Sequence, residues 1–132
     1  MFQKIALASR LLLGLMFTVF GLNGVLLSFL GKGFIPMPPP EGVMATIMAG
    51  FMATGYILPL AFLCELLGGL TLLSGFFVNA GIVFLGPVIV NILGIHLFAE
   101  PTGLPMAIVV VVLFVIVVKS RWAYFKPMLN MK

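Results

Sequence analysis

Four long apolar stretches constrain this chain more than any other feature of its sequence. Each approaches the roughly 20 residues that an α-helix needs to cross the hydrocarbon core of a bilayer. Hydrophobic residues make up 63% of the 132 residues and charged residues only 8%, whereas soluble domains carry about 25% charged residues. We therefore predict a single-domain, all-α integral membrane protein, folded as a four-helix bundle. The predicted spans cover residues 11–30, 57–77, 80–98 and 104–121.

The segment between the first two spans has two parts, and neither is long enough to cross a membrane. Residues 34–41 are rich in proline, which favours an extended polyproline II path. A stiff spacer on the membrane surface and a lid over a cavity mouth both agree with this composition. Residues 43–54 have helical periodicity but would extend only about 18 Å, so we expect a short interfacial or re-entrant helix. An alternative is one span over residues 43–63, broken at Pro59, which would leave Glu65 near a membrane surface.

The positions of the basic residues predict an orientation. Placing both termini in the cytoplasm leaves Lys32 as the one basic residue outside, in agreement with the positive-inside rule. We expect a bacterial or archaeal cytoplasmic membrane. Residues 11–30 are too long for the core of a cleaved secretory signal. Because the basic residues flank the spans and form no stripe, we expect the lipid bilayer as a partner and no nucleic acid. The flanking residues are Lys4, Arg10, Lys119, Arg121, Lys126 and Lys132.

Glu65 is the candidate catalytic residue, because it lies inside an apolar run. Ionisable groups at membrane depth cost roughly 2.5 kcal/mol or more, so they usually face the protein interior and serve a function. Gly68 and Gly69 share the helix face of Glu65, which indicates that the acid points into the bundle. With both termini on one side, Asn23 and Asn91 fall at a similar depth, about 10 Å from the outer helix ends. The three residues predict a polar layer beside a pocket that opens outward or laterally.

Each polar residue also has a purely structural interpretation. Glu65 can be a structural acid hydrogen-bonded to Asn23 or Asn91, and both amides can be interhelical contacts. His96 ends the third span, about 140° around the helix from Asn91, so the two should not share a face. Cys64 should point away from the face of the acid as a small packing residue, and one cysteine excludes dithiol chemistry by this subunit alone. One histidine, one cysteine and scattered acids predict no metal site.

Several short motifs are spread over nearly the whole chain. They are FGLNG (20–24), IPMPPP (35–40), TGYILPL (54–60), Glu65 with Gly68 and Gly69, and GPVIVNI (86–92) with HLF (96–98). Together they resemble the DoxX family of small four-helix membrane proteins. The resemblance implies a four-span bundle. It also implies a link to membrane-associated oxidoreductase systems, such as the quinone-reducing thiosulfate oxidoreductase of sulfur-oxidising archaea and a mycobacterial thiol and superoxide defence complex. The family supplies no agreed catalytic residues to carry over.

Three functions remain open, and whether the chain is an enzyme is open with them. The first is a membrane subunit or accessory protein of a redox system, with oxidoreductase subunits or further copies of the chain as partners. It would hold a quinone or another lipid-soluble molecule non-covalently, with Glu65 exchanging a proton and Asn23, Asn91 and His96 binding the ligand. The second is a non-catalytic scaffold or assembly factor. The third, a small-solute or proton pathway, is weakened by the apolar fourth span, which resembles a lipid-facing anchor, and by the lack of an inverted repeat.

Overall fold

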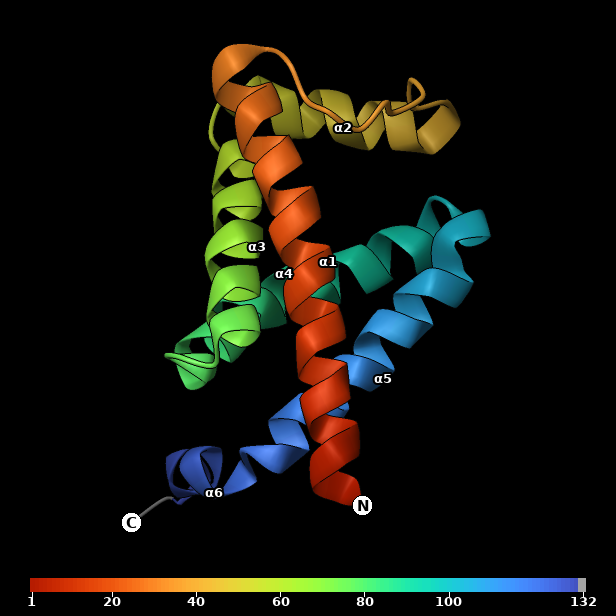
Figure 1. The fold of residues 1–132 in the computed structure, drawn as a ribbon. Helices are drawn as coiled ribbons and strands as arrows, with labels where there is room; N and C mark the ends of the chain where they lie inside the picture. The colour runs from red at the N-terminus through yellow and green to blue at the C-terminus, as the bar shows by residue number, and fades with distance from the viewer. Residues whose placement is uncertain (131–132) are drawn as a thin grey trace.

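The computed structural model describes residues 1–130, and these residues form helices and connecting turns without a strand. The predicted all-α class is therefore confirmed. The long elements are α1 (Phe2–Leu30), α2 (Gly42–Thr54), α3 (Ile57–Ser74), α4 (Val78–Phe98) and α5 (Leu104–Ser120), shown in Figure 1. The short elements are η1 (Pro101–Gly103), α6 (Trp122–Phe125) and η2 (Lys126–Leu129).

Four helical segments are long and apolar enough to cross a membrane: α1, α3, α4 and the run Pro101–Ser120 that contains α5. Many of their large apolar side chains are exposed on the outside of the bundle, as expected where lipid is the solvent. The chain is therefore a membrane protein with a helical bundle.

The helix boundaries differ from the predicted spans at a few positions. α1 begins at Phe2, well before residue 11. α3 ends at Ser74 rather than at residue 77, because Gly75 adopts the left-handed conformation that closes many helices. Gly55, with a φ of 75°, likewise separates α2 from α3. The alternative of one span over residues 43–63 is therefore wrong.

α1 and α3 pack side by side through glycines. A Cβ atom at Gly21 would lie 2.8 Å from the Cα of Leu66, and one at Gly14 would lie 2.7 Å from the backbone N of Leu73. Gly69 of α3 lies equally close to the backbone of α1. Glycines at these positions therefore let the two helix backbones approach closely.

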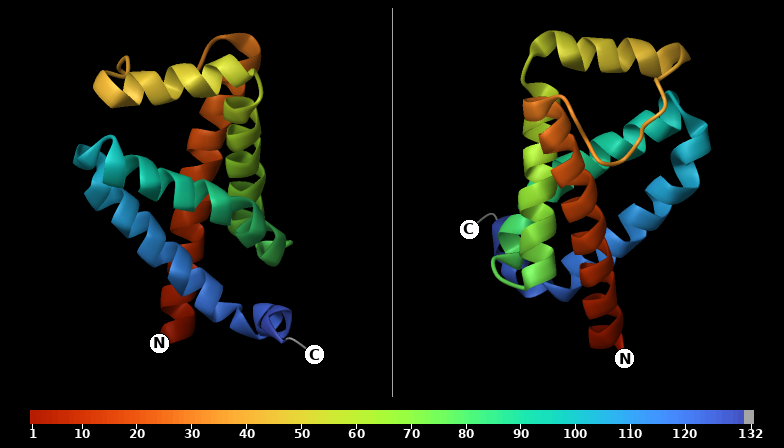
Figure 2. Two further views of the ribbon diagram at one scale, coloured as in Figure 1. Left: turned by 180° about the vertical axis from the view of Figure 1, so that it is seen from behind. Right: turned by 45° about the horizontal axis from the view of Figure 1, so that its top comes forward.

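α4 and α5 form a hairpin that is tilted away from the α1–α3 pair (Figure 2). α4 packs on α3, whereas α5 packs on α1 and α4. The buried core lies where these helices meet, and includes Leu13, Phe17, Leu72, Leu85 and Val110. Pro87 lies inside α4 without ending it.

α2 lies across one end of the bundle, and both termini lie at the opposite end (Figures 1 and 2). None of the residues of α2 is buried, and its contacts are mainly with α3. It does not enter between the long helices, which is the geometry expected of an interfacial helix.

Candidate functional site: two cavities beside Glu65

Glu65 lies on the face of α3 that meets α1 and α4. Gly69, one turn along, contacts the backbone of α1, and Gly68 contacts the side chain of Leu85 in α4. The half-buried Glu65 lines two separate cavities. The position of Glu65 therefore agrees with the expectation, based on Gly68 and Gly69, that this acid points into the bundle.

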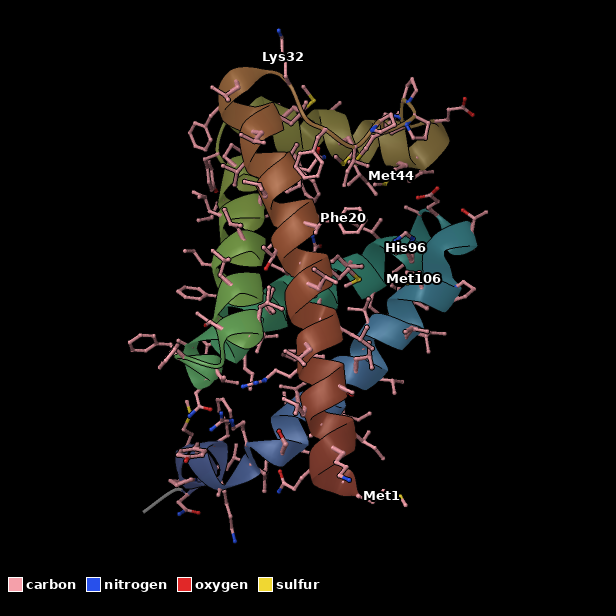
Figure 3. The ribbon with its side chains drawn as sticks, in the orientation of Figure 1. Met1, Phe20, Lys32, Met44, His96 and Met106 are labelled. Atoms are coloured by element: carbon pink, nitrogen blue, oxygen red, sulfur yellow. The ribbon has the colours of Figure 1, made fainter. Side chains whose placement is uncertain are left out.

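The first cavity, here called the central cavity, has a volume of about 360 Å³. Its wall comes from α1, α3, α4, α5 and the proline-rich segment. The polar residues in it are Asn23, Glu65 and His96, and the large apolar ones include Phe20, Phe62 and Met106. Figure 3 shows Phe20, His96 and Met106 on three different helices around this region. Residues from both helix pairs therefore contribute to one mostly apolar space.

The second cavity, here called the lateral cavity, has a volume of about 580 Å³ and lies among α2, α3 and α4. α2 contributes Met44, Met48 and Phe51. Asn91 lines this cavity together with Glu65, and so does Cys64, which we expected to face away from the acid. The lateral cavity is wide enough to reach past a single helix face, so Cys64 can line it without sharing the face of Glu65. Both cavities share Met37, Phe62, Glu65 and Ile92.

Asn23 holds the loop that follows α1. Its side chain is 2% exposed, and its Oδ1 accepts hydrogen bonds from the backbone N–H groups of Phe34 at 2.7 Å and Ile35 at 2.9 Å. Gly33 lies so close that a Cβ there would clash with the same amide. Asn23 thus ties a loop to α1, whereas we expected a contact between helices. Within residues 1–130 no hydrogen bond joins Glu65 to Asn23 or Asn91.

His96 is held by the turn that leads into α5. Its Nδ1 lies 3.0 Å from the backbone oxygen of Glu100. A carbonyl oxygen only accepts, so Nδ1 carries the hydrogen, and Nε2 of the neutral ring is then an acceptor. Gly103 lies directly against the ring, leaving no room for a side chain. The turn therefore fixes His96 at the central cavity.

The three residues of the predicted polar layer are divided between the two cavities. Asn23 lines the central cavity and Asn91 the lateral one, while Glu65 lines both. Pro87 also lines the lateral cavity, and it leaves the carbonyl of Val83 without its usual helical donor. The lateral cavity thus combines an apolar wall with a few polar groups.

Three residues that line the cavities were not identified from the sequence. Met106 and Val110 of α5 line the central cavity, although the fourth span resembled an anchor that faces only lipid. A span without polar side chains carries no signal that separates its lipid face from its cavity face. Met37 lines both cavities, and the proline-rich composition around it was the available signal.

Among the described residues, no group of three or more His, Cys, Asp and Glu side chains could hold a metal ion. Comparisons with known proteins add no relative. No family model matches the chain, and no match was found among curated proteins or solved structures. What the site does is therefore inferred from its geometry.

Proposed function

We propose that the protein binds a quinone, or a similar lipid-soluble molecule with polar oxygen atoms, in the central cavity as a subunit or accessory protein of a membrane redox system. One observation carries this proposal: Glu65, Asn23 and His96 line one apolar cavity of about 360 Å³. Ligand cavities typically measure about 300–1,000 Å³ and combine apolar walls with a few polar groups.

The composition of the walls supports a planar ring with oxygen acceptors. Phe20 and Phe62 offer aromatic surfaces, and Met106 offers a flexible apolar one. A protonated Glu65 can donate a hydrogen bond to a ligand carbonyl, and the amide nitrogen of Asn23 can donate another. The adjoining lateral cavity supplies apolar surface for a hydrocarbon chain.

In this proposal the chain supplies binding and a proton, and a partner supplies electrons. Reduction of a quinone to a quinol takes up two electrons and two protons. Glu65 would donate one proton and, after taking up a proton from solvent water, would donate the second. Cys64 is the one cysteine of the sequence and forms no dithiol. The electrons would come from the redox centre of an oxidoreductase partner, a class that the resemblance to DoxX proteins also suggests.

Thermal unfolding with water-soluble menaquinone and ubiquinone analogues tests the binding. Ligand at 100 times its Kd should stabilise the protein by about 2.7 kcal/mol. Glu65→Ala should lose most of this stabilisation, because it removes the donor to the ligand. Glu41→Gln is the control, since Glu41 lies outside both cavities and its side chain makes no capping hydrogen bond. No stabilisation of the wild type at saturating ligand would contradict the proposal.

A non-catalytic scaffold is the second candidate, and the hydrogen bonds of Asn23 to the loop favour it. Glu65→Gln separates the two candidates, because glutamine keeps the volume and hydrogen bonding but cannot titrate. A variant that retains full cellular function would support the scaffold. Loss of function in a folded Glu65→Gln protein would support the redox role.

We also propose that the protein lies in a bacterial or archaeal cytoplasmic membrane with both termini in the cytoplasm. The start of α1, the end of α5 and α6 lie at one end of the bundle (Figure 1). The basic residues in or next to these segments are Lys4, Arg10, Lys119, Arg121 and Lys126. Lys32 lies at the opposite end (Figure 3). Lys132 belongs to the same predicted cluster but lies outside the described residues.

A further inference from the structure

A third cavity lies at the end of the bundle that carries both termini, far from Glu65. It has a volume of about 520 Å³, and its wall comes from the start of α1 and from the turn between α5 and α6. Its polar residues are Gln3, Arg10, Ser120, Arg121 and Tyr124. None of these residues belongs to the site described above.

Two arginines, Arg10 and Arg121, line this cavity, and no carboxylate lines it. The three acids of the sequence are Glu41, Glu65 and Glu100, and none of them lines the cavity. Glu41 and Glu100 flank α2 and η1, which lie away from α6 and the N-terminus (Figure 1). Arg10 and Arg121 therefore face the cavity without a compensating negative charge from these acids.

Arg10 also has an unused donor. Its Nε is buried and has no hydrogen-bond partner within residues 1–130. A buried polar group without a partner is costly, and a hydrogen bond from a guanidinium to an anionic oxygen is among the strongest in proteins. The side chain lies against Gly75 at the end of α3, which holds it close to the helix bundle. An anion with several oxygen acceptors in the cavity would compensate the charge of this guanidinium group, for which the acids of the chain provide no partner there.

The surroundings are those of a membrane interface. Trp122 and Tyr124 are 45% and 62% exposed, and aromatic residues of this kind gather at the level of lipid headgroups. Arg121 lies over the ring of Tyr124, with its Cζ 5.6 Å from the ring centroid. Leu7 in the same cavity wall is 49% exposed and offers an apolar surface. A ligand here can place a charged group on the arginines and an apolar part against α1.

We propose that this cavity binds the phosphate headgroup of an anionic phospholipid through Arg10 and Arg121. The planar guanidinium group matches the geometry of phosphate oxygens, and basic pockets of this kind between membrane helices recognise lipid headgroups. The bound lipid bridges α1 and the α5–α6 turn. Two arginines could bind either the phosphate of a lipid headgroup or free inorganic phosphate. The experiments below therefore test the lipid and the soluble anion separately.

Native mass spectrometry of the purified protein tests the lipid source. The probe is an equimolar mixture of phosphatidylglycerol and phosphatidylcholine with identical acyl chains. The wild type should retain phosphatidylglycerol preferentially, and Arg10→Gln or Arg121→Gln should each reduce this preference about fivefold. Lys32→Gln, which removes the same charge at the opposite end, should retain the wild-type preference. Equal retention of both lipids by the wild type, or an unchanged preference in both arginine variants, would overturn the proposal.

Two further measurements separate lipid binding from a folding defect and from binding of free phosphate. Arg10→Lys keeps the positive charge but loses the planar pair of donors, so its preference should lie between those of the wild type and Arg10→Gln, and a folding defect in Arg10→Gln alone does not decide the result. Millimolar inorganic phosphate should leave the thermal stability of the wild type unchanged. Stabilisation by phosphate that requires both arginines, without a preference for phosphatidylglycerol, would overturn the lipid as the occupant in favour of a soluble anion.

Discussion

Two polar residues inside the bundle have different hydrogen-bonding situations. The oxygen of Asn23 is occupied by two backbone donors of the loop, whereas Glu65 is open to both cavities. The sequence makes both residues conspicuous because apolar runs surround them. It does not reveal their partners, because the path of the loop decides which backbone donors reach Asn23.

The first prediction concerns this loop. Asn23→Ala leaves the N–H groups of Phe34 and Ile35 without their acceptor, so unfolding in detergent micelles should become easier by about 1–3 kcal/mol. Asn91→Ala, which removes an exposed amide, should cost less than about 0.5 kcal/mol. Denaturation followed by circular dichroism measures both. Equal losses would contradict the role assigned to Asn23.

The second prediction uses His96, the single histidine of the sequence. Nitrogen NMR of protein labelled on histidine should show the hydrogen on Nδ1, because the oxygen of Glu100 only accepts. Gly103→Ala should displace the ring and abolish this preference for one tautomer. Gly94→Ala is the control, since a Cβ there would meet nothing within 4 Å. A Gly103→Ala spectrum identical to that of the wild type would contradict the packing described.

At the level of elements, the contact between α1 and α3 depends on glycine. Gly21→Ala places a Cβ against the backbone of Leu66, which cannot move aside as a side chain could. We expect a loss of about 1–3 kcal/mol in the free energy of unfolding. Gly50→Ala, in open space within α2, should be neutral or stabilise the helix by up to about 1 kcal/mol. Denaturation of the two variants side by side is the measurement, and matching midpoints would refute the contact.

The helices themselves were largely predictable, whereas their exact ends and faces were not. Apolar length and glycine or proline punctuation indicate where α1, α3, α4 and α5 lie. The end of α3 depends on Gly75 taking the left-handed conformation. The sequence alone does not show that the helix ends at this residue, because other glycine and serine residues lie nearby. The cavity face of α5 has no signal in the sequence, because Met106 and Val110 are as apolar as its lipid face.

For the whole molecule, the sequence indicates four helices and two differently charged ends, but not how the helices are tilted. The tilt of the α4–α5 hairpin away from the α1–α3 pair separates Asn23 from Asn91 (Figure 2). From the sequence, we estimated the membrane depth of each polar residue by counting residues from the helix end, which assumes that the helices are parallel. That assumption predicted one polar layer where the structure has two cavities.

The proposed orientation yields a prediction for the whole molecule. A fluorescent protein fused after residue 132 should be fluorescent in a bacterial host, and alkaline phosphatase fused there should be inactive, because both termini are placed in the cytoplasm. Alkaline phosphatase fused after residue 33, truncating the chain beyond the first span, should be active. The reverse pattern of activities would refute the orientation.

The glycine contact between α1 and α3 also determines which parts of the molecule can move. Backbone packed on backbone has no rotamers to exchange, so this pair behaves as a fixed frame. α2 has no buried residue, and the segment before it is held through Asn23. Among the walls of the lateral cavity, α2 is therefore the one least fixed by packing, whereas the α3 wall that carries Glu65 belongs to this frame. Ligand entry would then change the shape of the cavity around the acid without moving the acid itself.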